Sequence, residues 1–297
     1  MKIETKADLM LVLVTLCWGV SYYLMEICLE EMGTLTLNAF RFLGAFIIAG
    51  IVMFPKIRKV NKATLKYSFY ISISLIFVYT GATLGVQYTS LSNTGFLCAL
   101  AVVFTPILAF FIKKQKPGKK MAFVVLICLI GMSLMTLSDE LKPALGDAFS
   151  LMCSFAYAID LIITETAVSR EDVDAFQLGV YQLGFTGVWM LILAFVFEEP
   201  CLPQTAMGWG SALFLAVFCT GVAFIVQAIA QKYTTATRVG VIFTLEPVFA
   251  GIVAFAFAGE VLLPRAYLGA VFMLVSLLIM EIDTKELIAK LTRKKTL

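Results

Sequence analysis

The chain has 297 residues, of which 61% are hydrophobic and only 14% charged, and its mean hydropathy is +0.94. An ordinary soluble domain is about 45–50% apolar and about 25% charged, so this composition excludes a protein folded around one water-bounded core. The formal net charge of +3 is small, and its distribution along the chain is more informative than its total.

Ten apolar segments follow one another along the chain. Each holds about 20 residues, enough to cross about 30 Å of hydrocarbon as a helix. The polar links between them are too short to hold a soluble domain. The sequence therefore predicts an all-α membrane protein with ten transmembrane helices, at residues 8–29, 35–54, 66–88, 92–112, 120–138, 146–167, 175–197, 209–230, 237–258 and 264–282.

The basic residues indicate how these helices are oriented. Ten crossings put both termini on one side, together with twenty of the lysine and arginine residues, and leave only Lys142 and Arg265 on the other side. Cytoplasmic loops carry such an excess of basic residues. The pattern predicts a multi-pass plasma membrane protein with cytoplasmic N- and C-termini, whose basic runs contact lipid headgroups and not nucleic acid.

The second half of the sequence repeats the first at an offset near 140. The segment "GATLGVQ" (81–87) matches "GVAFIVQ" (221–227), and "FTPILA" (104–109) matches "LEPVFA" (245–250). We therefore predict two five-helix repeats, residues 1–142 and 143–297, the second ending in a short basic tail. Because five is odd, the second repeat enters the membrane from the opposite side, an inversion that is typical of transporters that work by alternating access.

Four motifs resemble one known family. They are "CWGVSYY" (17–23), "NAFRFLGAF" (38–46), "FTPILAFF" (104–111) and "TLEPVFAGIVAFAFAGEVL" (244–262). Together they are similar to the EamA family of the drug/metabolite transporter superfamily. The resemblance implies ten helices in two inverted repeats, a central cavity, and secondary transport of small metabolites or drugs, commonly outward. One departure is that Lys114-Gln115 stands in the first half where Gly259-Glu260 stands in the second.

Two acids lie deep in predicted helices. Counting about 1.5 Å per residue, Glu246 lies roughly 14 Å and Asp160 roughly 9 Å from the inner ends of their helices. A charged side chain at such depth costs about 2.5–3.5 kcal/mol unless it faces a cavity or a partner. Both acids are therefore candidates for substrate binding and proton coupling, since neighbouring carboxyl groups can share protons. The alternative for Glu246 is a structural acid that binds backbone carbonyls freed around Pro247.

Two prolines interrupt predicted helices. Pro106 and Pro247 occupy matching positions in the fourth and ninth helices, and each lacks the backbone N–H that the preceding turn needs. We expect a helix bend at both positions. Only the second bend carries an acid, so the predicted site is asymmetric.

A buried basic residue and an acid lie near the first extracellular turn. Arg41 lies about four residues beyond the outer start of the second helix, and Glu26 lies at a similar distance from the outer end of the first. They are predicted to form either a structural pair or part of an outer gate that contacts substrate.

Aromatic residues recur at similar depth in four helices. Their faces, with two carboxyl groups and no lysine at the midplane, favour a cationic or zwitterionic substrate with an apolar body. The predicted substrate-binding residues are thus Trp18, Tyr22, Tyr79, Tyr157, Asp160, Phe243 and Glu246.

The sequence contains no histidine, no C-x-x-C pair and no common hydrolase motif. We therefore expect no catalytic residues, no metal and no cofactor. The predicted function is a secondary active transporter of amino acids, amines or amphiphilic drugs, acting as an exporter by alternating access, with protons as the candidate coupling ion. The alternative is an importer of a small organic cation such as a quaternary amine. Its partners are the small-molecule substrate and the lipid bilayer.

Overall fold

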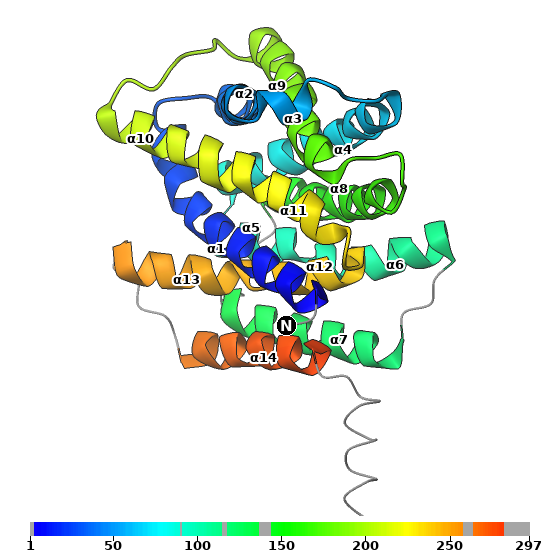
Figure 1. The fold of residues 1–297 in the computed structure, drawn as a ribbon. Coiled ribbons are helices and arrows are strands. Elements are labelled where there is room, and N and C mark those ends of the chain that lie inside the picture. Colours follow the sequence, from blue (N-terminus) through cyan, green and yellow to red (C-terminus); the bar gives the residue numbers. More distant parts are fainter. Residues whose placement is uncertain (1–2, 90, 115–117, 137–143, 258–263, 282–297) are drawn as a thin grey trace, which may run out of the picture.

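A computed structural model describes residues 3–89, 91–114, 118–136, 144–257 and 264–281, and within these ranges every regular element is helical. The elements are α1 Ile3–Leu29, α2 Thr34–Val52, α3 Phe54–Ile57, α4 Lys62–Tyr88, α5 Leu91–Ala99, α6 Ala101–Lys113, α7 Lys119–Thr136, α8 Leu145–Val168, α9 Ala175–Phe197, α10 Ala206–Phe214, the π-helix η1 Leu215–Val222, α11 Ala223–Gln231, α12 Ala236–Phe243, α13 Glu246–Phe257 and α14 Pro264–Glu281. Figure 1 shows their arrangement.

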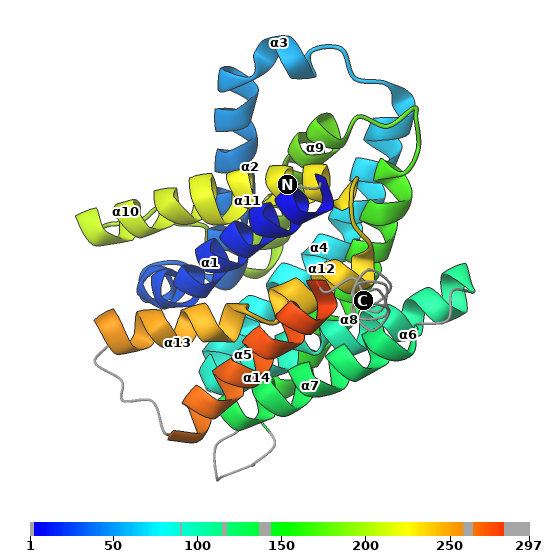
Figure 2. The ribbon, with the colours of Figure 1, turned by 60° about the horizontal axis from the view of Figure 1, so that its bottom comes forward.

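Eight helical stretches of the described chain are long and apolar enough to cross a bilayer, and α14 contributes a shorter apolar helix, Pro264–Met280. The eight are Ile3–Leu29, Thr34–Val52, Lys62–Tyr88, Thr94–Lys113, Leu145–Val168, Ala175–Phe197, Ala206–Gln231 and Ala236–Phe257. The all-helical class is as predicted. Each of the ten predicted segments contains helix, and α7 lies beside α14 in both views (Figures 1 and 2).

Three of the predicted helices are interrupted. The ninth divides into α12 and α13 at Thr244 and Leu245, just before Pro247. The fourth divides into α5 and α6 at Leu100, whereas Pro106 lies inside the continuous α6. The eighth changes from α-helix to π-helix over η1. The interruption of the fourth helix thus lies about one and a half turns before Pro106, and the expected bend at Pro106 stays a prediction.

The long helices pack in a recurrent pattern. α1 packs against α11 and α13, and α8 packs against α4 and α6. α2 contacts η1 and α9 contacts α4, while α2 lies along α9 and α7 along α14. The crossing of α1 over α13 is close: a Cβ atom on Gly19 would lie 2.5 Å from the Cβ of Phe249.

Side chains in the links fix where helices begin. Asn61, Asp174, Thr205 and Thr235 each accept a hydrogen bond from the backbone N–H three residues later, as expected of N-cap residues.

Two glutamates connect loops from the two halves of the chain. Glu31, after α1, accepts hydrogen bonds from the backbone N–H groups of Gln204 (2.6 Å) and Thr205 (3.2 Å) and from the Thr205 hydroxyl. These donors, the hydroxyl foremost, lower the pKa of the Glu31 carboxyl below its ordinary value. Glu198, after α9, accepts in the same way from Leu35 and Thr36 at the start of α2. The ends of α1 and α9 are thereby tied to the starts of α10 and α2.

Candidate functional site

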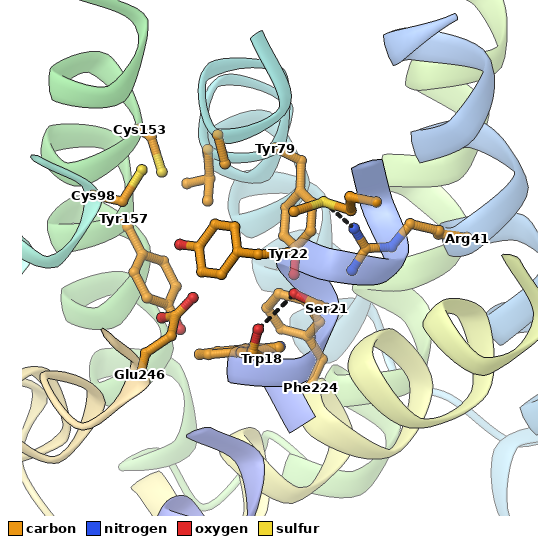
Figure 3. Close-up of a pocket in the computed structure, with 13 residues that line it drawn as sticks. Trp18, Ser21, Tyr22, Arg41, Tyr79, Cys98, Cys153, Tyr157, Phe224 and Glu246 are labelled. Carbon is orange, nitrogen blue, oxygen red and sulfur yellow. Dashed lines mark hydrogen bonds between the residues drawn. The ribbon is translucent and has the colours of Figure 1, made fainter. Parts of the chain in front are cut away.

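A cavity lies between helices of the two halves and is lined mainly by aromatic and apolar side chains (Figure 3). Its volume is about 70 Å³, enough for a few water molecules but less than the roughly 300–1,000 Å³ of pockets that hold drug-sized ligands. The lining residues are Trp18, Ser21, Tyr22, Met25, Arg41, Val78, Tyr79, Ala82, Cys98, Cys153, Tyr157, Phe224 and Glu246.

Five of the seven predicted substrate-binding residues line this cavity: Trp18, Tyr22, Tyr79, Tyr157 and Glu246. Trp18 is at the centre of the aromatic group. Its ring centroid lies 5.9 Å from that of Tyr157 and 5.8 Å from that of Phe224. Its indole N–H donates a 2.8 Å hydrogen bond to the carbonyl of Cys219 in η1, which fixes the ring against the π-helix. The rings of Trp18, Tyr157 and Phe224 form the aromatic wall of the cavity. The hydrogen bond to Cys219 fixes this wall to the backbone of the π-helix.

Glu246 is the first residue of α13, immediately after the helix interruption. The N–H groups and dipole at a helix N-terminus stabilise negative charge there. The Tyr22 side chain lies beside the Glu246 carboxyl group and interacts with it electrostatically. Pro247 thus places the acid at a helix start beside the cavity, half-buried, where the carboxyl group can contact a ligand.

Arg41 lies across the cavity from Glu246, with Tyr22 and Trp18 between them in the view of Figure 3. It is only 1% exposed. Its Nε donates to the Thr220 hydroxyl (3.2 Å), its Nη1 to the Met25 sulfur (3.1 Å), and its Cζ lies 5.0 Å from the centroid of the Tyr79 ring. Among the described residues Arg41 forms no ion pair, so its guanidinium has only neutral partners while it faces the cavity.

The predicted partner of Arg41 lies elsewhere. Glu26 is on α1 next to Met25, but its side chain is exposed, and no contact joins it to Arg41 in the described part of the chain. Their positions in the sequence place both residues near the same end of the helix bundle. The rotation of each helix about its own axis turns Arg41 inward and Glu26 outward, so only Arg41 reaches the site.

Asp160 and Phe243 lie behind the lining. Phe243 stacks on Tyr157 at 6.0 Å and 9° and meets Trp18 edge-on at 4.7 Å, so it supports the aromatic wall. Asp160, 1% exposed, interacts with the Gln227 side chain, and its Oδ1 has no hydrogen-bond partner in the described residues.

The side-chain amide of Gln227 connects Asp160 to the cavity. Gln227 accepts a 3.1 Å hydrogen bond from the Tyr157 hydroxyl, and donates to Gln231, which donates in turn to the carbonyl of Leu161. Asp160 is therefore joined to the site through Tyr157 instead of lining it.

Sequence reasoning missed several lining residues. On α1, Ser21 and Met25 share a face with Trp18 and Tyr22, and the three-to-four residue spacing could have identified them. Cys98 on α5 and Cys153 on α8 bring their thiol groups close together at the cavity, and no sequence spacing predicts that pairing. Within the described residues, no group of three or more histidine, cysteine, aspartate or glutamate side chains could hold a metal ion.

Ion pairs close the end of the bundle at which α1 begins. Glu165 at the end of α8 binds Lys113 at the end of α6 (2.9 Å) and accepts a hydrogen bond from the backbone N–H of Ala236 at the start of α12. Asp8 near the start of α1 pairs with Arg238 of α12, with Nε–Oδ2 at 3.0 Å. These contacts join α1, α6, α8 and α12 at this end, and α1 and α8 also line the cavity. Gly259 and Glu260 of the family motif lie outside the described residues.

The model of the EamA-like transporter family matches the chain over residues 5–137 and 144–282. The chain belongs to the EamA-like transporter family. This confirms the resemblance drawn from the four motifs, and it makes the chain a multi-pass transmembrane transporter of the drug/metabolite type that takes small-molecule substrates.

Two relatives of this EamA-family chain are both named as uncharacterized transporters. An uncharacterized transporter of Archaeoglobus fulgidus is 29% identical over 285 residues, covering 93% of this chain and 86% of its own length. The uncharacterized transporter YoaV of Bacillus subtilis is 22% identical over 252 residues, covering 82% and 86%. One solved crystal structure matches with a TM-score of 0.78 at 13% identity, over 95% of this chain and 99% of the other, which shows that the two share a fold.

Proposed function

We propose that this EamA-family chain is a secondary active transporter that exports small zwitterionic metabolites, amino acids above all, by alternating access around the cavity of Figure 3. The observation that carries the proposal is the pairing of charges: Arg41 and Glu246 lie on opposite sides of one aromatic-lined cavity. Amines and amphiphilic drugs are the broader substrate class within which amino acids fit these two charges best.

The two charges match the two ends of an amino acid. A guanidinium presents several N–H donors in a plane that suits a carboxylate, and neutral partners leave the charge of Arg41 uncompensated. Glu246 can accept hydrogen bonds from an ammonium group. The rings of Trp18, Tyr79 and Tyr157 provide apolar faces for the rest of the substrate.

The alternative is import of a small organic cation such as a quaternary amine. The aromatic rings and Glu246 favour it, because a cation binds well against the faces of tryptophan and tyrosine. Arg41 disfavours it, because a second positive charge in a cavity of about 70 Å³ would repel the substrate.

The packing pattern supports two inverted repeats, residues 1–142 and 143–297. If α1, α2, α4, α5–α6 and α7 correspond in order to α8, α9, α10–α11, α12–α13 and α14, three main contacts of the long helices have counterparts. The α1–α13 contact corresponds to α8–α6, α1–α11 to α8–α4, and α2–η1 to α9–α4. The two segments matched by the family model, 5–137 and 144–282, divide the chain at the same place.

Alternating access follows from this symmetry. Opening at one end requires the ion pairs Glu165–Lys113 and Asp8–Arg238 to separate, and the positive-inside pattern assigns that end, with both termini, to the cytoplasm. Opening at the other end exposes the cavity to the opposite side of the plasma membrane. Glu246, with Asp160 joined to the site through Gln227 and Tyr157, is the candidate carrier of a coupling proton.

A counterflow assay tests the proposal. Proteoliposomes loaded with an unlabelled amino acid would be given a tracer of the same compound, then of the matching amine that lacks the carboxylate, and then of the N-acetylated acid that lacks the ammonium. Leucine, isopentylamine and N-acetylleucine form one such matched set, and an aromatic set would be run beside it.

We expect exchange of at least one amino acid and at least about tenfold slower exchange of both analogues, since a site built for two charges rejects a ligand that lacks one. Exchange of the amine at the rate of the amino acid would favour the cation alternative. Exchange that is absent for every amino acid in a full panel would contradict the proposed substrate class.

A further inference from the structure

An apolar groove lies between α6 and α7. It has a volume of about 660 Å³, and its lining contains no charged side chain. The lining residues are Val103, Pro106, Ile107, Phe110, Phe111, Met121, Ala122 and Val125. Ile107, Phe110 and Phe111 are exposed, so the groove is open to the surroundings of the helix bundle. In a transmembrane protein those surroundings are lipid chains.

The groove has the length of one lipid leaflet. From Val103 to Lys113, at the end of α6, the helix rises roughly 15 Å at 1.5 Å per residue. This is half of the roughly 30 Å thickness of the hydrocarbon core. A single acyl chain that enters from the headgroup region at Lys113 would therefore lie along the whole groove.

The end of the groove is strongly basic. Residues 101–136 contain five lysines and no acid, and all five lysines lie between positions 113 and 120. Lys113 is bound to Glu165, and the Lys120 Nζ donates to the carbonyl of Met280. Lys114, in a left-handed conformation at the end of α6, and Lys119, at the start of α7, have exposed side chains.

We propose that this groove binds one anionic glycerophospholipid, with an acyl chain between α6 and α7 and the headgroup phosphate on Lys114 and Lys119. The two parts of the site match the two parts of such a lipid, and basic pockets at helix ends on the cytoplasmic side are suited to anionic headgroups. A second copy of this chain is a poorer occupant, because a symmetric contact here would bring two sets of five lysines together. The site is distinct from the transport cavity, so the proposal does not depend on the substrate.

Lipid retention measured by native mass spectrometry tests the proposal. The purified protein would be reconstituted in bilayers of phosphatidylcholine with phosphatidylglycerol, released, and weighed with its bound lipid. Two variants disrupt the two halves of the site: Lys114→Gln with Lys119→Gln removes the charges, and Ala122→Trp fills the groove. Matched controls are Lys59→Gln with Lys62→Gln, which removes two exposed lysines before and at the start of α4, and Phe123→Trp, at an exposed position outside the groove lining.

We expect the wild type and both controls to retain phosphatidylglycerol several-fold over phosphatidylcholine, and each site variant to lose that preference. Glycerol 3-phosphate, which has the charge without the chains, should not displace the lipid. Equal retention of the two lipids by the wild type would overturn the proposal, as would retention unchanged in both site variants. A dimer that Ala122→Trp converts to a monomer would show that a second copy occupies the groove, which also overturns it.

Discussion

Arg41 is a buried cation whose described partners are a hydroxyl, a thioether and an aromatic ring. Such neutral groups solvate a guanidinium only in part, and an uncompensated charge inside a protein is strongly destabilising. A residue of this kind remains in a fold when a ligand supplies the missing charge. In the proposed function that ligand is the carboxylate of the substrate, which would bind across the cavity from Glu246.

Replacing Arg41 by glutamine separates this role from a structural one. We expect Arg41→Gln to weaken binding of the amino acid by at least about tenfold, or about 1.4 kcal/mol, while binding of the matching amine changes less. The substrate-free protein should keep its melting temperature or gain a few degrees, because an unpaired charge is removed. Thermal-shift titrations with both ligands would measure this. Loss of both ligands together with a lower melting temperature would indicate a structural role.

Much of the cavity follows from depth along the helices, which is proportional to residue number. Trp18, Tyr22, Tyr79, Tyr157 and Glu246 were predicted in that way, and they line one cavity. Which way a side chain points depends on how each helix rotates against its neighbours. For that reason the sequence leaves Arg41 either in a structural pair with Glu26 or in an outer gate, and it places Asp160 in the site although that residue lies behind the lining.

At the scale of elements, the site depends on two departures from regular helix. The α12–α13 interruption puts Glu246 at a helix start, and the π-helix η1 presents Thr220 to Arg41 and the Cys219 carbonyl to Trp18. Pro247 identified the first from the sequence. The π-helix had no such signal, because no residue pattern in Leu215–Val222 distinguishes an α-helix from a π-helix.

The close crossing of α1 and α13 holds Glu246 beside Tyr22, and it requires glycine at position 19. In Gly19→Ala the new Cβ would lie 2.5 Å from the Phe249 Cβ and 2.9 Å from the Ala250 backbone nitrogen. We expect the helices to separate at a cost of about 1–3 kcal/mol, with a lower melting temperature and slower transport. The control is Gly210→Ala in α10, where a Cβ meets nothing within 4 Å and the helix should gain about 0.5–1 kcal/mol.

Thermal unfolding of the two alanine variants in one detergent would check this prediction. A melting temperature that changes equally in both would mean that the crossing tolerates a methyl group and that glycine is not needed there.

At the scale of the whole molecule, the all-helical membrane class and the family followed from composition and motifs. Composition is sufficient here because apolar helices of this length have one stable environment, the bilayer. The inverted duplication stays a prediction, supported by contacts that recur in both halves. Its mechanical consequence is that the turns after α4 and after α11 lie at opposite membrane faces and open alternately.

Cysteine labelling tests that consequence. In a background without native thiols, we expect cysteines at Thr89 and at Thr234 to react from opposite sides of the membrane. Thr89 closes one end through its 2.8 Å hydrogen bond to Asp147, and Thr234 lies in the link before α12. Substrate should raise the labelling rate of one and lower that of the other. Rates that change in parallel at both positions would argue against alternating access.

The transport rate of Glu246→Gln, measured across pH in proteoliposomes, tests most directly whether this cavity is the transport site. Glutamine keeps the shape of the side chain and leaves Pro247 in place, but it removes the charge that would hold the ammonium group or a coupling proton. We predict that transport falls at least about tenfold at every pH while the protein remains monodisperse, and that Asp160→Asn, acting through Gln227 and Tyr157, shifts the pH profile. Wild-type transport by Glu246→Gln, with an unchanged pH profile, would contradict the account and leave Glu246 as a structural acid beside a helix interruption.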